Sequence, residues 1–433
     1  MQQPEEESSA LPRISQVNDH GREVRADTLR PLAPISEPDR IASLDVLRGV
    51  AVLGILVMNI QAFSMVHAAY VNPTAYGSLE GADGAVWLLS HVLAKRKFMT
   101  IFSMLFGAGI IVLTSRAEAR GRSALRLHYR RTLWLILFGL LHAYLLWTGD
   151  ILYAYGMSAL VAYWLRRLPP RWLVLIALVL LAIPSGVMMA MDWSIRFWSP
   201  EQYEAALWGW APGTEEVEYQ MSVYRGSWLH QLPDRAHIAF WGQTASFGMF
   251  GVWRILGCMF LGMALYRLGV FSASRSVRFY LALIVAAVLA GLPVTLLGVW
   301  LCHRNDWSLH YSMFQGKQFN YWASIPVALG WVGLVMLLCR SAGLEWMKRP
   351  LAAVGRTALS NYLFQTVICT TIFFGHGFSL FGRVSRVQQI LFVLAIWVVQ
   401  IVGSSLWMRY FRLGPLEWLW RSLSYWRFQP MLR

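Results

Sequence analysis

The chain has 433 residues, of which 57% are hydrophobic, 14% aromatic and only 14% charged, and its formal net charge is +15. A soluble fold is excluded, because about a quarter of the residues of a soluble domain are charged. Most of the arginines lie in short links between apolar runs, where basic residues orient a membrane protein. The positive charge therefore predicts contact with a lipid bilayer and no nucleic-acid partner.

Residues 1–38 are polar, rich in proline and of mixed charge, and they lack the apolar core of a secretory signal. We predict a disordered tail over these residues. Residues 39–411 contain apolar runs of the roughly 20 residues that cross a bilayer of about 30 Å. The sequence predicts an all-α integral membrane protein with a bundle of about ten transmembrane helices, centred on residues 44–66, 98–114, 132–149, 150–165, 171–191, 247–266, 279–301, 322–339, 353–375 and 388–408.

The second predicted span is short, and Lys95, Arg96 and Lys97 stand directly before or at its start. Residues 85–96 could therefore lie along the membrane interface instead. Alternate connections carry about twice as many Lys and Arg residues on one side of the membrane as on the other. By the positive-inside rule, both termini are predicted to be cytoplasmic, in a bacterial inner membrane.

Two segments outside the predicted spans have a character of their own. Residues 192–245 combine acidic and aromatic side chains, which predicts either a folded extracytoplasmic cap or an interfacial aromatic belt. Residues 412–433 follow the last span and are predicted to form an amphipathic cytoplasmic tail.

Polar residues within the first span are candidate site residues. Inserting an ionisable side chain at mid-membrane costs about 2.5–3.5 kcal/mol of free energy, so such residues are expected to face the bundle interior and to have a function. Arg48 and Asn59 are 11 positions apart and therefore share one helix face. Together with Asp45 at the inner end and His67 at the outer surface, they form a polar stripe. The alternatives are a local Asp45–Arg48 pair at a helix start and an Asn59 that only bonds a neighbouring helix.

The third predicted span places His142 near mid-membrane, with Asp150 at its outer end. His142 is either a structural histidine bonded to another helix or a group that handles protons. Asp150 is expected to cap the following helix, and the alternative is a catalytic residue near the acceptor. Further polar residues are expected to face the bundle interior, in the ninth span and the sixth: Asn361, Gln365 and Arg254.

Several reaction classes lack their motifs in this sequence. The chain contains no phosphate-binding GxxxxGK[ST] loop, no HExxH pair and no GxSxG elbow, so nucleotide hydrolysis is not expected. The four cysteines are scattered among apolar runs without a CxxC pair, which predicts neither a disulfide framework nor a metal site.

Six blocks of sequence resemble the bacterial YeiB-like membrane protein family, over nearly the whole chain from Arg40 to Pro430. They are LDVLRGVAVLGILVMNI (44–60), FSMLFGAGI (102–110), GLLHAYLLWTGDIL (139–152), LGMALYRLGV (261–270), GRTALSNYLFQTVIC (355–369) and GPLEWLWRSLSY (414–425). This resemblance implies a multi-span membrane protein, but it does not specify a reaction.

The first block is also similar to the start of heparan-α-glucosaminide acetyltransferase and of the wider transmembrane acyltransferase superfamily. That resemblance implies transfer of an acyl group from cytoplasmic acyl-CoA to a sugar amine or hydroxyl across the membrane. The pattern D-x-x-R-G followed by Asn falls on Asp45, Arg48, Gly49 and Asn59. The expected histidine would be His67, which follows Asn59 more closely than in that family, and His142 is the rival base.

The resulting hypothesis is an acyltransferase, with acetyl the expected group and a glycan the expected acceptor. Acyl-CoA is the co-substrate, and no covalently bound cofactor is expected. Asn59 would orient the thioester carbonyl, and Arg48 with Arg130 or Arg131 would meet the CoA phosphates. The alternatives are a transporter of a small organic molecule or of acyl-CoA, and a membrane scaffold without catalysis. The sequence specifies neither the acceptor nor the oligomeric state.

Overall fold

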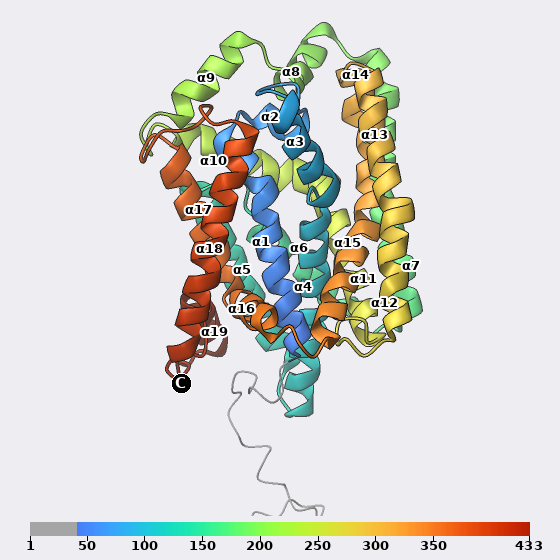
Figure 1. The fold of residues 1–433 in the computed structure, drawn as a ribbon, viewed down its shortest axis with the longest axis vertical. Helices are drawn as coiled ribbons and strands as arrows, with labels where there is room; N and C mark the ends of the chain where they lie inside the picture. The colour runs from blue at the N-terminus through green and yellow to red at the C-terminus, as the bar shows by residue number, and fades with distance from the viewer. Residues whose placement is uncertain (1–40) are drawn as a thin grey trace, which may run out of the picture.

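The structure is a computed structural model that describes residues 41–433 (Figure 1). The tail predicted at residues 1–38 lies outside the described residues. Over residues 41–433 the chain is helical and contains no β-strand. The α-helices up to residue 194 are α1 (Ala42–Ser64), α2 (His67–Val71), α3 (Gly81–Leu93), α4 (Lys97–Ala119), α5 (Ala124–Leu145), α6 (Leu152–Leu165) and α7 (Pro170–Ser194).

The remaining chain continues in the same helical manner, with a 3₁₀ turn η3 (Ile195–Phe197) after α7 and three π-helical segments. Its elements are α8 (Pro200–Trp210), α9 (Thr214–Tyr224), α10 (Leu232–Trp241), η4 (Gly242–Gly251), α11 (Val252–Arg267), α12 (Val277–Ala286), η5 (Ala287–Gly291), α13 (Leu292–Arg304), α14 (Leu309–Tyr311), η6 (Ser312–Gly316), α15 (Lys317–Arg340), α16 (Glu345–Arg356), α17 (Ala358–Phe373), α18 (Arg386–Tyr410) and α19 (Pro415–Tyr425).

The predicted class, an all-α membrane protein, is confirmed. Within residues 41–433, seven helical stretches are long and apolar enough to cross a membrane: Ala42–Ser64, Gly81–Ala119, Pro170–Phe197, Leu232–Arg267, Val277–Arg304, Leu309–Arg340 and Arg386–Tyr410. Helices α6 and α17 are apolar but shorter than these seven stretches. Helix α5 is not among the seven, and its first two turns contain several arginines. These three helices correspond to the remaining predicted spans, so the count of ten stays a prediction.

Helix α1 runs through the middle of the bundle (Figure 1), and 72% of its apolar window is buried inside the protein. The corresponding share is only 22% for α7, for the α12–α13 stretch and for α18. Large apolar side chains such as Leu178, Leu289 and Val398 are exposed on these outer helices. In a protein of this class, such exposed surfaces face lipid.

Two glycines allow α1 and α16 to cross at backbone contact. A Cβ atom added to Gly49 would collide with the carbonyl of Leu351, and one added to Gly355 would collide with the carbonyl of Asp45. Small residues at such crossings let membrane helices approach closely. The crossing places the first turn of α1, with Asp45 and Arg48, directly beside the end of α16.

The bundle has two distinct ends (Figure 1). The arginine end, at the bottom of the view, is where α1 and α5 begin, where α4 ends and where α16 and α19 lie. The cap end, at the top, carries α2, α8 and α9, and the Asn72 side chain binds the Trp210 carbonyl there at 3.0 Å. The candidate span that contains α11 already begins at Leu232, within the segment 192–245 that the sequence assigned to the cap.

Candidate functional site

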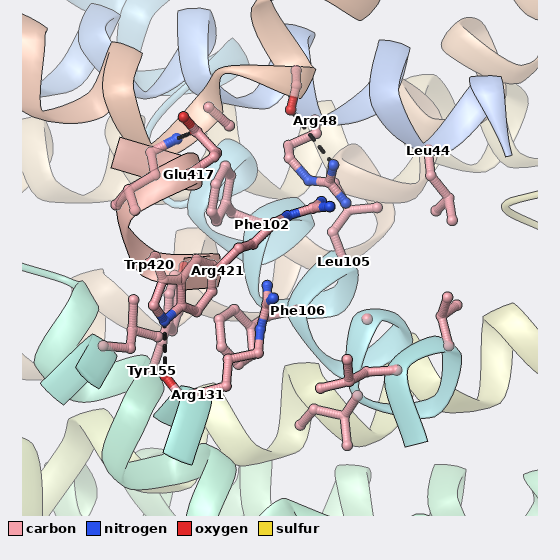
Figure 2. Close-up of a pocket in the computed structure, with 18 of the residues that line it drawn as sticks. Leu44, Arg48, Phe102, Leu105, Phe106, Arg131, Tyr155, Glu417, Trp420 and Arg421 are labelled. Atoms are coloured by element: carbon pink, nitrogen blue, oxygen red, sulfur yellow. Dashed lines mark hydrogen bonds between the residues drawn. The ribbon is translucent and has the colours of Figure 1, made fainter. Parts of the chain in front are cut away.

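A cavity of about 270 Å³ lies at the arginine end of the bundle. Its walls come from α1, α4, α5, α6, α16, α17 and α19, so residues from both ends of the chain meet there. Apolar side chains such as Phe102, Leu105 and Phe106 form part of the wall (Figure 2). We call it the arginine cavity.

Positive side chains dominate the polar part of this wall. Two carboxylates, Asp45 and Glu417, also line the cavity. Six arginines of the described residues line the same cavity: Arg48, Arg116, Arg120, Arg131, Arg356 and Arg421. Arginine presents a planar fork of donors that matches phosphate and carboxylate groups. The cavity is therefore suited to an anion that also has an apolar part.

Arg48 is held by its own helix. Its Nη1 donates to the Asp45 carboxylate at 2.9 Å and lies 3.5 Å from the carbonyl oxygen of Gly355. The Arg48 side chain is 33% exposed and that of Asp45 is 15% exposed. The local pair predicted from the sequence is thus present, and it lies in the cavity wall, so the pair and a ligand-binding role are compatible.

Arg131 is oriented by a residue that is nearly 290 positions away in the chain. Its guanidinium carbon lies 3.6 Å from the centre of the Trp420 ring. The Trp420 indole nitrogen in turn donates to the Arg131 carbonyl at 2.8 Å. Figure 2 shows Arg48, Arg131 and Arg421 directed into the same cavity. Arg130, the other predicted phosphate contact, does not line it.

Glu417 caps helix α17. Its carboxylate accepts hydrogen bonds from the backbone nitrogens of Leu359 (2.6 Å) and Ser360 (3.2 Å) and from the Ser360 hydroxyl (2.6 Å). Burial raises the pKa of Glu417, whereas the hydrogen bonds from Ser360 and Leu359 act to lower it. Because its oxygens bind the start of α17, Glu417 attaches α19 to the bundle and is already engaged by the protein.

His142 lies in a buried hydrogen-bonded row. Its Nδ1 is 2.9 Å from the Asp150 carboxylate and its Nε2 is 3.0 Å from the Thr366 hydroxyl. The side chains of His142 and Asp150 are almost completely buried, with exposures of 0% and 1%. The partner that a mid-membrane histidine requires is therefore present on both sides of the ring.

Asp150 has the capping role expected of it and also contacts His142. One oxygen contacts His142, and the other accepts the backbone N–H of Tyr153 at 2.8 Å in the first turn of α6. His142 itself does not line the arginine cavity. The Tyr362 ring does line it, and its centre is 5.2 Å from that of the imidazole. Tyr362 therefore lies between the cavity and the Asp150–His142–Thr366 row.

His67 is the first residue of α2 and lies at the cap end. Its ring packs edge-on against the Tyr224 ring, with 5.2 Å between the ring centroids. Its backbone N–H donates to the Gln220 side chain at 3.0 Å. Burial lowers the pKa of His67, and the charge of Asp234 partly opposes this effect. Neither His67 nor Asn59 lines the arginine cavity.

The three other predicted interior residues serve helix contacts. Asn361 and Gln365 both bond to Gln400, at 3.1 and 3.0 Å, which joins α17 to α18. Arg254 donates to the hydroxyls of Thr100 and Ser324 at 3.0 and 2.7 Å. None of these three residues lines the arginine cavity.

Most of the cavity's arginines were not singled out from the sequence. Arg116 and Arg120 follow a predicted span, and Arg421 lies in the predicted tail, so they entered only the count of orienting charges. A signal for Arg421 was available in residues 415–425, where apolar and polar residues alternate with helical spacing and α19 forms. That pattern indicates one buried face, on which Trp420 and Glu417 lie.

Comparison with known proteins identifies the family. The chain is 33% identical over 388 residues to the "uncharacterized protein YeiB" of Escherichia coli (strain K12), which covers 89% of this chain and 96% of that protein. The chain belongs to the YeiB-like family. It is also 29% identical over 425 residues to the "uncharacterized protein YxaH" of Bacillus subtilis (strain 168), covering 93% and 98% of the two chains.

The profile of the family described as "Protein of unknown function (DUF418)" matches residues 265–427 of this YeiB-like protein. The matched segment supplies Arg356, Glu417, Trp420 and Arg421 to the arginine cavity, whereas Arg48 and Arg131 precede it. The cavity therefore joins residues from the matched segment to residues from the first half of the chain.

Proposed function

We propose that this YeiB-like protein binds acyl-CoA in the arginine cavity and transfers its acyl group to an acceptor on the other side of the membrane. The observation that carries the proposal is the combination of six arginines with apolar and aromatic walls in one cavity. Acyl-CoA has phosphate groups for the arginines and an acyl chain for the apolar surface. Such a cavity fits a ligand of mixed character better than a small polar solute.

The proposed membrane topology supports entry of acyl-CoA from the cytoplasm. With α5, α6 and α17 counted as spans, the bundle has ten crossings, and an even number returns both termini to one side. The excess of arginine at this end supports a cytoplasmic position for the cavity. Labelling of a single cysteine introduced at Arg120, in sealed vesicles of known orientation, tests this: modification from the extracytoplasmic side alone would contradict it.

In this proposal His142 is the general base, oriented by Asp150. The acceptor hydroxyl or amine attacks the thioester carbon and forms the new ester or amide bond while the carbon–sulfur bond breaks. The acceptor's proton passes to His142 Nε2 and then to the departing thiolate, which leaves as CoA thiol. Since Tyr362 separates the imidazole from the cavity, its side chain must move for the thioester to approach.

The decisive experiment measures CoA release by the purified protein in lipid nanodiscs, with acetyl-CoA and a panel of amino sugars and glycans. Acceptor-dependent release, with a labelled acyl group recovered on the acceptor, is the expected result. Binding of acyl-CoA without release, together with movement of labelled solute across vesicles, would instead assign the protein to transport. No binding of acyl-CoA at all would reject the proposal and leave a scaffold role.

A further inference from the structure

A second cavity, of about 210 Å³, lies at the cap end of the bundle. Its wall includes Tyr70 of α2, Trp210 of α8 and Trp307, together with residues of α13, η6 and α15. Three positive side chains line it: Lys95, Arg96 and Lys317. We call it the lysine cavity.

Two further cations lie next to this wall. Lys97, which is fully buried, donates to the Asn320 side chain at 2.5 Å, and Asn320 lines the lysine cavity. Arg254 is 6% exposed and lies against the Tyr321 ring, at 4.4 Å from its centre, while Arg96 lies 5.7 Å from the same centre. Five basic side chains thus lie in or directly beside the wall of one cavity.

The partners of these cations are neutral. Lys95 Nζ donates to the Tyr70 carbonyl at 2.8 Å, and Lys317 Nζ lies 5.0 Å from the centre of the Trp210 ring. No carboxylate lines the lysine cavity, and over residues 41–433 none of the five cations forms an ion pair. Asp192, which packs near η6, is bound by the Gln315 side chain at 2.9 Å.

The backbone adds to the positive field. Helix α4 begins at Lys97, and the preceding Arg96 has a left-handed φ of 70°. This conformation is unfavourable for a residue with a side chain, and it turns the chain between α3 and α4 at the cavity wall. The amino end of a long helix carries partial positive charge, so α4 and the lysines attract the same kind of group.

Charges buried without opposite charge are costly, and like charges repel one another. A bound anion would remove both costs at once. From the three basic side chains in the cavity wall, the two beside it and the absence of lining carboxylates, we propose that the lysine cavity binds an oxyanion: a phosphate or carboxylate group carried by a polar molecule or by a lipid head group. This site is separate from the arginine cavity, and the proposal does not depend on acyl transfer.

The test measures thermal unfolding of the purified full-length protein in a neutral detergent with a constant 150 mM sodium chloride. Inorganic phosphate is added to 5 mM, so that the ionic strength changes little, and a neutral sugar serves as the control solute. A parallel series adds short-chain phosphatidylglycerol or, for comparison, short-chain phosphatidylcholine. Phosphate should raise the melting temperature in a saturable way; an effect of phosphatidylglycerol alone would support the lipid head group as the source of the oxyanion.

Variants separate this site from the arginine cavity. Lys317→Met keeps the length of the side chain but removes its charge, so it should weaken phosphate binding by about tenfold or more. It should also raise the melting temperature without phosphate, which loss of a structural contact would not do. Arg304→Met, at an exposed position of α13 outside the cavity, and Arg48→Met, in the arginine cavity, should keep the phosphate effect.

Two outcomes would overturn the inference. One is stabilisation by neither phosphate nor phosphatidylglycerol. The other is a phosphate effect that Arg48→Met abolishes and Lys317→Met leaves intact, because it would locate the anion in the arginine cavity. Failure of acyl transfer in the CoA-release assay would leave the lysine cavity unaffected.

Discussion

The arginine cavity and the lysine cavity stabilise positive charge in different ways. In the first, Arg131 stacks on Trp420 and Arg48 pairs with Asp45, so the guanidinium groups already have partners within the protein. In the second, no carboxylate lines the wall: Lys95 donates to a backbone carbonyl, and Lys317 lies over the Trp210 ring. A guanidinium is planar and weakly hydrated, whereas an ammonium group is a compact charge that holds water strongly. We therefore expect the lysine cavity, which has no carboxylate in its wall, to gain more from a bound anion than the arginine cavity does.

The largest expected effect tests whether the protein catalyses acyl transfer next to the arginine cavity, with His142 as the base. His142→Gln removes the proposed base and should lower the maximal rate of acyl transfer by about 10² or more, with nearly unchanged acyl-CoA affinity. His67→Gln is the control, because His67 lies at the cap end and should affect stability alone. Single-turnover CoA release and equilibrium binding measure the two quantities. Equal activity of both variants would remove His142 from the mechanism.

The next effect tests whether the arginine cavity is the binding site. Arg131→Ala should weaken acyl-CoA binding by about 10- to 100-fold, the range for loss of a hydrogen bond to a charged group. Arg130→Ala is a matched control, since this neighbour has the same charge but does not line the cavity. Calorimetric titration with a non-hydrolysable acyl-CoA measures both. Similar losses for the two variants would indicate a general field effect and not a specific contact.

A third variant tests how strongly Glu417 attaches α19 to the rest of the bundle. Glu417→Ala leaves the first backbone N–H groups of α17 without their acceptor and should destabilise the protein by about 1–3 kcal/mol. Denaturation in mixed micelles, monitored by tryptophan fluorescence, measures the loss. Glu345→Ala, an exposed carboxylate at the start of α16, should change stability little. If Glu417→Ala lowered stability no more than Glu345→Ala does, the hydrogen bonds from the start of α17 to Glu417 would contribute nothing to stability.

The smallest effect concerns the cap end. Since burial holds the pKa of His67 below its usual value, the unfolded chain takes up a proton first as the pH falls. The stability that His67 contributes is therefore fully present above its unfolded pKa of about 6.5 and is lost as the pH falls through the lower folded value. His67→Gln should reduce the difference between melting temperatures at pH 7.5 and pH 5.5. An unchanged difference would show that His67 is solvated in the folded protein.

The sequence predicted those parts of the site that depend on local geometry. Asp45 and Arg48 form their pair within one helical turn, and Asp150 accepts a backbone N–H at the start of α6, as its expected capping role requires. The contact between His142 and Asp150 was not predicted. Contacts between distant segments could not be predicted, because nothing in the local pattern relates Arg131 to Trp420. Lys97 shows the same limit: it was placed at the edge of a short span, yet Asn320 of another helix holds it fully buried.

The arginine cavity also has a consequence for biosynthesis. Its first arginine is made near the start of the chain, and the α19 residues that complete the wall emerge about 370 residues later, roughly 20–70 s at bacterial elongation rates. Arg131 follows Arg48 after 83 residues, but Trp420 and the rest of the α19 wall are absent until the end of this interval. Asp45, one turn earlier on the same helix, is translated before Arg48 and accompanies it from the beginning. The Asp45–Arg48 ion pair thus stabilises the charge of Arg48 before the α19 part of the cavity wall has been synthesised.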